Sequence, residues 1–351
     1  MKRILFILPI VLILIFVLNK MRIGQHIQNP SNAQTLKVLA WEGYADPSIV
    51  KKFKEQFGIE VEITYVENDD SLWNLVNQNT QYDLIAANTA EISRYISAGL
   101  LSPLDLQLIP NTKNQDTAFA NLDTIKGISQ GDKIFAIPYV YSEMGIIYNK
   151  KILSIPPHSM KIMWDPKYQG KILAFNTYQH NFTLSALLNK HDNIFNLNDT
   201  EIKNIAKDLL KLKNNVLTFY TTIEEATSIF NENNIAILFG NFGQQQVSDL
   251  IKNGADIGYV IPNEGALAWL DCWAITSYSR NKENAHRWIN FLLLEENSKW
   301  LKLNHSLHHT LEDLSEFTSG KKIIWLEPVS NPILRKQLWD SILDNKPLDN
   351  Q

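Results

Sequence analysis

An aspartate, Asp271, stands inside one of the most apolar segments of this sequence. It follows Trp269-Leu270 and precedes Cys272-Trp273-Ala274, in a segment that is typical of a buried strand. Burying a carboxylate is costly unless a partner compensates its charge, so we predict that Asp271 and the neighbouring Trp269 contact a ligand rather than only fill the core. The adjacent Cys272 is predicted to be a buried small hydrophobic residue and not a nucleophile.

Residues that could support catalysis are few. His305, His308 and His309 cluster on an expected loop without an acidic partner, so no metal site is predicted there. The sequence has no Gly-x-Ser-x-Gly, P-loop or Gly-x-Gly-x-x-Gly motif. We therefore expect no catalytic residue, no cofactor and no enzymatic activity.

Residues 36–98 read as an α/β unit. Strands are expected at 36–41 and 82–88, and the alternation over 59–65 predicts an outer strand with one wet face. Asp46-Pro47 should begin a helix that Gly58 ends, and a second helix should cover 91–98. This order predicts a mostly parallel sheet flanked by helices.

In such sheets, ligands gather at the carboxyl ends of the strands. Trp41, Glu42 and Tyr44 follow the first strand, and Asn88-Thr89 follow the third, so all five are candidate ligand contacts. The alternatives are that Trp41 packs in the core and that Asn88 and Thr89 cap the next helix.

The rest of the chain continues the α/β pattern. Strands are expected at 133–139, 145–148, 171–175 and 235–239, helices at 204–212 and 224–231, and one long apolar helix from Lys282 to about Leu303. The 351 residues suggest two domains, and no linker separates them. The chain is therefore expected to cross between the domains more than once.

The net charge and the N-terminal segment indicate which partners this protein can bind and in which compartment it is located. The formal charge is −4, which disfavours a nucleic-acid partner. Lys2 and Arg3 precede an apolar run from Ile4 to Leu18, so residues 1–33 are expected to be a signal peptide or an uncleaved membrane anchor, giving a periplasmic protein. That segment holds four basic and no acidic residues, so the remainder carries −8, which suits a cationic ligand.

Several motifs carry a family resemblance across roughly residues 36–300. They are Trp41-Glu42-Gly43-Tyr44, Tyr82-Asp83-Leu84-Ile85, Trp164-Asp165-Pro166 and Trp269-Leu270-Asp271. Together they resemble periplasmic solute-binding proteins of spermidine/putrescine ABC importers. The resemblance implies a type II periplasmic binding fold, with lobe 1 formed by 36–139 plus 270–315, lobe 2 by 140–269 plus 316–351, and a ligand cleft between them.

The resemblance also implies a monomeric polyamine carrier that delivers its ligand to an ABC permease, with Trp41, Tyr44, Trp269 and Asp271 matching family ligand contacts. An acid of the family motif is replaced by Gly43, with Glu42 displaced by one position. A second acid is replaced by His180, which is also a candidate ligand contact, and a tryptophan is replaced by Gly240. These departures leave open a smaller cationic amine, a non-polyamine solute, or a membrane-tethered sensory module on the same fold.

Overall fold

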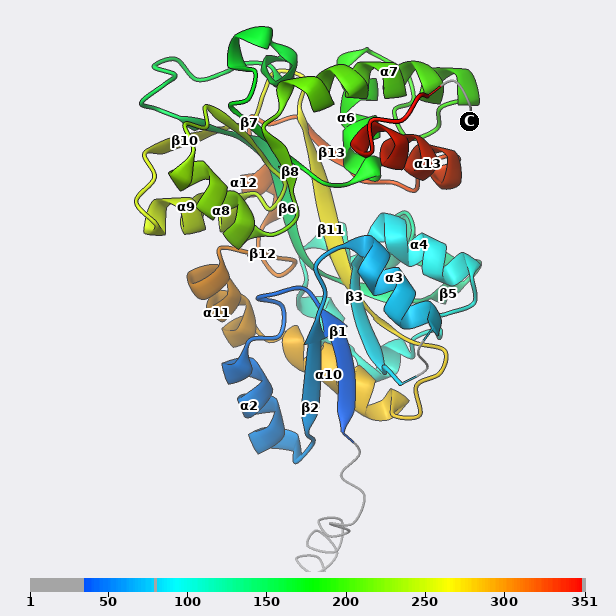
Figure 1. Ribbon diagram of the computed structural model, residues 1–351. Coiled ribbons are helices and arrows are strands. Elements are labelled where there is room, and N and C mark those ends of the chain that lie inside the picture. The colour runs from blue at the N-terminus through cyan, green and yellow to red at the C-terminus, as the bar shows by residue number, and fades with distance from the viewer. Residues whose placement is uncertain (1–34, 79–80, 349–351) are drawn as a thin grey trace, which may run out of the picture.

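Two α/β lobes stacked along one axis make up the molecule (Figure 1). The computed structural model describes residues 35–78 and 81–348. Strands β6 (Ala136–Asn149) and β11 (Ala266–Ile275) run between the lobes and connect their sheets. The strand order is β2 (Val61–Tyr65), β1 (Leu36–Ala40), β3 (Leu84–Asn88), β11, β6, β9 (Ile237–Gly240), β7 (Ile172–Phe175) and β8 (Thr218–Tyr220). The two long strands therefore lie at its centre.

The lower lobe in Figure 1 begins with the predicted strand and helix alternation. Asp46 accepts a hydrogen bond from the Ser48 amide at the start of α2, and Gly58 ends this helix with φ +70°. The edge position of the second strand is also confirmed. The elements are β1 (Leu36–Ala40), α2 (Pro47–Phe57), β2 (Val61–Tyr65), α3 (Asp69–Gln78), β3 (Leu84–Asn88), α4 (Thr89–Ser97), α5 (Thr117–Ala120), β4 (Ser129–Gln130) and β5 (Lys133–Ile134).

The upper lobe holds a second parallel set of strands, in which β7 pairs with both β8 and β9. Its helices lie on the two sides of these strands, with the C-terminal helix α13 beside α6 and α7. The elements are β7 (Ile172–Phe175), α6 (Tyr178–Leu188), α7 (Asp199–Asn215), β8 (Thr218–Tyr220), α8 (Ile223–Glu232), β9 (Ile237–Gly240), α9 (Gln244–Lys252), β10 (Ile257–Val260), β13 (Ile323–Trp325) and α13 (Pro332–Leu343).

The prediction of two separate strands at 133–139 and 145–148 is wrong, because β6 is one strand of 14 residues. Its first part pairs with β11, and from Gly145 onward it pairs with β9. Gly145 permits the close approach of a ring rather than a turn, since a Cβ there would lie 2.6 Å from the Tyr259 ring.

The single helix predicted from Lys282 to Leu303 is also wrong. Two helices, α10 (Lys282–Leu292) and α11 (Glu295–His305), occupy this region, and the Asn297 side chain donates to the Phe291 carbonyl at the break. The three histidines do not lie on a loop: His305 ends α11, and His308 and His309 form β12 (His308–His309), which pairs with β6. The expectation that they lack an acidic partner is also wrong, because His305 Nε2 lies 3.0 Å from Asp46 and His308 Nδ1 lies 3.3 Å from Glu312. The short helix α12 (Leu314–Thr318) follows. Cys272 is buried, as predicted.

Among the residues that the structure describes, no helix is long and apolar enough to cross a membrane. The segment 1–33, expected to be a signal peptide or anchor, lies outside those residues. The residues at which the two lobes divide stay a prediction.

Candidate ligand-binding cleft

A cavity of about 630 Å³ is lined by residues of both lobes. This volume falls within the range of typical small-molecule sites. Residues at or just after the carboxyl ends of β1, β2 and β3 line it from the lower lobe, and residues of α6, of the segment after β9 and of α13 line it from the upper lobe. The structure brings together seven of the eight predicted site residues here: Trp41, Glu42, Tyr44, Asn88, His180, Trp269 and Asp271.

Asp271 is a buried acid at the cavity, with 5% of its surface exposed. The Tyr44 hydroxyl donates to its Oδ2 at 2.7 Å, and no basic side chain among the described residues forms an ion pair with it. Burial raises the pKa of Asp271 to about 7, and the hydrogen bond from Tyr44 offsets this only in part. A cationic ligand would therefore supply the compensation that the protein does not.

Two tryptophans provide aromatic surface beside this acid. Trp269 is held by a hydrogen bond from its Nε1 to the Asn241 carbonyl oxygen, at 3.0 Å. Trp41 is half-buried, and its Nε1 is closed off from solvent without a hydrogen-bond partner. Aromatic faces of this kind attract cations and cover alkyl chains.

His180 is a neutral group in this cleft. Its Nδ1 lies 2.8 Å from Asn241 Oδ1, and because the amide oxygen accepts, the ring proton belongs on Nδ1. Burial lowers the pKa of His180 to about 4, more than the hydrogen bond raises it. His180 therefore does not add a positive charge that would repel a cationic ligand.

The other departures from the family motifs have different structural reasons. Glu42 lines the cavity, and its side chain is largely exposed. Its pKa is raised, mainly by partial desolvation and to a smaller extent by repulsion from the Glu224 carboxylate. Gly43 has φ +86°, and a Cβ there would lie 3.0 Å from His305 Nδ1, so a larger residue would be strained. Gly240 lies in β9 opposite Gly145 and outside the cavity lining.

Thr89 is the predicted contact that does not line the cavity. Its hydroxyl donates to the Leu326 carbonyl oxygen at 3.2 Å, which favours a structural role. Asn88 combines both predicted roles, since its side chain accepts from the Glu91 amide at 3.0 Å and also lines the cavity.

The sequence interpretation missed several lining residues, most importantly Asp69, Tyr178 and Trp339. For Asp69 the signal was present, because it follows the end of β2 and the carboxyl ends of parallel strands share one edge. Trp339 has no local signal, because it belongs to α13, which is brought to the cleft only by tertiary packing.

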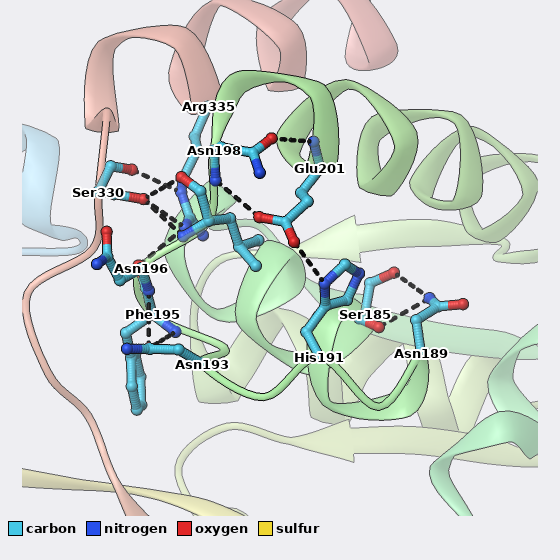
Figure 2. A network of polar contacts seen from close by, with 11 residues as sticks. Ser185, Asn189, His191, Asn193, Phe195, Asn196, Asn198, Glu201, Ser330 and Arg335 are labelled. Carbon is cyan, nitrogen blue, oxygen red and sulfur yellow. Dashed lines mark hydrogen bonds and ion pairs between the residues drawn. The ribbon is translucent and has the colours of Figure 1, made fainter.

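Figure 2 shows the polar network that fixes α13 in place. Arg335 is fully buried, and its guanidinium donates to the carbonyl oxygens of Phe195 at 3.0 Å and Ser330 at 2.9 Å. Asn198 and Glu201 form a capping box at the start of the neighbouring α7. The network therefore holds one face of α13, while Lys336 and Trp339 of the same helix line the cavity.

Comparison with known proteins agrees with this architecture. Residues 48–304 match the family described as bacterial extracellular solute-binding protein. The chain belongs to this family. The matched family is one of solute-binding proteins. No metal-holding group of three His, Cys, Asp or Glu side chains occurs in the described part of the chain.

The relatives include periplasmic proteins that bind polyamines. This chain is 28% identical over 278 residues to the putrescine-binding periplasmic protein PotF of Escherichia coli, covering 74% of this chain and 73% of that protein. It is 25% identical to spermidine/putrescine-binding periplasmic protein 1 of Haemophilus influenzae, covering 87% and 83%.

Among solved structures, a putative spermidine/putrescine ABC transporter protein from Listeria monocytogenes superposes with a TM-score of 0.75 at 22% identity, covering 89% of this chain and 99% of that one. The predicted two-lobed type II periplasmic binding fold is confirmed.

Proposed function

We propose that this protein is the solute-binding component of an ABC importer and captures a polyamine or a related small cationic amine between its lobes. The observation that carries the proposal is Asp271, a buried acid at the cavity whose one hydrogen bond comes from Tyr44 and which has no basic partner among the described residues. An ammonium group is the ligand chemistry that such a site lacks.

The roles of the other residues follow from their places around the cavity. The ammonium group would lie on Asp271, and the alkyl chain would lie against Trp41 and Trp269. Trp269 belongs to β11, whereas His180 on α6 lines the cavity from the upper lobe. A ligand bound by both lobes favours their closed arrangement, since its contacts are complete only there.

The relatives' periplasmic location supports the same location here, and closure would produce the form that a membrane permease accepts. We infer that the lobes divide as the sequence predicts, near Tyr139-Val140 in β6 and near Trp269-Leu270 in β11, because both strands pass from one lobe to the other.

Isothermal titration calorimetry of the purified protein tests this proposal. We expect heats of binding for putrescine or spermidine and none for glutamate. Thermal melting gives a second readout, because a ligand at 100 times its Kd stabilises the folded state by about 2.7 kcal/mol. Binding of a neutral or anionic solute with no response to any amine would contradict the proposal.

A further inference from the structure

Besides Asp271, Asp69 is an acid of the cavity that is not exposed and forms no ion pair with the described residues. It is the first residue of α3 and follows the end of β2. The side chain as a whole is half-buried, and its Oδ1 is closed off from solvent with no hydrogen-bond partner. A buried carboxylate oxygen without a hydrogen-bond donor is costly.

The nearby basic residues are already paired. Lys336 is the one lysine or arginine among the described residues that line the cavity. Its Nζ lies 3.3 Å from Asp70 and 3.1 Å from Asp340. Arg94 lies 3.3 Å from Glu91 and stacks on the Trp73 ring at 3.6 Å. Neither cation is therefore available to neutralise Asp69.

The surroundings of Asp69 add negative charge. Burial and the nearby carboxylates of Glu91 and Asp271 raise the pKa of Asp69 well above its usual range, and Arg94 lowers it only in part. Glu91 is 1% exposed and accepts a hydrogen bond from Gln179 of the opposite lobe. Asp69 thus lies in a region of negative potential that a second cation would relieve.

We propose that Asp69 binds a second ammonium group of the ligand, while Asp271 binds the first. This rests on the function proposed above and deepens it, because it restricts the ligand to molecules with two ammonium groups. It also explains how the cleft functions without acids at positions 43 and 180, where Gly43 and His180 stand.

The test compares α,ω-diamines of three to six carbons with the primary monoamine of the same carbon number, by calorimetry on the purified protein. The wild-type protein should bind the best diamine about 10- to 100-fold more tightly than its monoamine, the range expected for one charged hydrogen bond. In Asp69→Asn this ratio should fall to within about threefold, with the monoamine affinity unchanged.

Asp70→Asn is the matched control, because Asp70 is the next residue and already pairs with Lys336. It should leave the ratio of diamine to monoamine affinity unchanged. Thermal melting of both variants checks the fold, and Asp69→Asn should melt at or above the wild-type temperature because it removes an uncompensated acid.

The outcomes separate the two proposals. If no amine binds, the proposed function itself fails. If the wild type binds both amines equally, or if Asp69→Asn weakens both by the same factor, the protein remains an amine carrier and the role of Asp69 is overturned.

Discussion

Two aspartates lie at opposite ends of the same strand pair and are equally buried, yet their surroundings differ. Asp83 precedes β3, and Asp271 lies on β11 opposite Asn88, the last residue of β3. Each is 5% exposed. Asp83 accepts hydrogen bonds from the Lys37 amide, the Ser279 hydroxyl and the Asn281 side chain, whereas Asp271 accepts one, from Tyr44.

The difference shows that burial alone does not mark a functional acid. At the amino end of β3 the fold supplies the donors that a carboxylate needs, and Asp83 joins β1, β3 and the segment before α10. At the carboxyl end the donors are missing and a cavity takes their place. We infer that Asp83 stabilises the fold, whereas Asp271 lacks further protein donors because a ligand supplies them.

The largest expected effect is on ligand affinity at the carboxyl end. Asp271→Asn should weaken amine binding by about 30-fold or more, because losing one partner of a buried charge pair costs about 2–5 kcal/mol. Calorimetry measures the loss, and circular dichroism should show an unchanged fold. Unchanged affinity would mean that Asp271 does not bind the ammonium group, and Asp271 and Asp83 would then not differ in function.

The second effect is on stability at the amino end. Asp83→Ala should lower the free energy of unfolding by about 2–3 kcal/mol, since it leaves one buried and two partly buried donors without this acceptor. Urea denaturation measures this change. The ligand affinity of the folded variant should match that of the wild type, and an affinity loss as large as that of Asp271→Asn would remove the distinction between the two acids.

A third effect concerns pH. The pKa of Asp271 is raised to about 7 in the folded protein, whereas an unfolded aspartate titrates near 3.9. The folded state therefore holds a proton between about pH 4 and 7 that the unfolded state has lost, so Asp271 lowers stability as the pH rises through this window.

Denaturation of ligand-free protein at several pH values tests this sign. Asp271→Asn should be more stable than the wild type by about 1–3 kcal/mol at pH 8, with the difference shrinking towards pH 4. The comparison with this variant cancels contributions shared by both proteins, such as those of His180 and His309, whose lowered pKa values act in the opposite direction. An equal difference at every pH would contradict the titration of Asp271.

The sequence predicted those parts of the molecule that depend on neighbours along the chain. The caps of α2, the edge position of β2 and the burial of Asp271 in an apolar strand all follow from local patterns. The continuity of β6 was missed because it depends on pairing with β11 and β9, which are distant in sequence. The role proposed for Asp69 was missed for the same reason, since its isolation depends on Lys336 pairing with Asp70 and on Arg94 lying over Trp73, and both contacts join residues distant in sequence.

The smallest expected effect is at the rim of the cleft, where Asp70 pairs with Lys336 across the lobes. Both side chains are nearly half exposed, and pairs of this kind contribute about 0.2–1 kcal/mol. Lys336→Met should therefore change diamine affinity by less than about fivefold at moderate salt, as measured by calorimetry. A larger loss would show that the ion pair stabilises the closed arrangement of the lobes. Asp70 would then differ from both Asp83 and Asp271, because its partner would be available only when the lobes are closed.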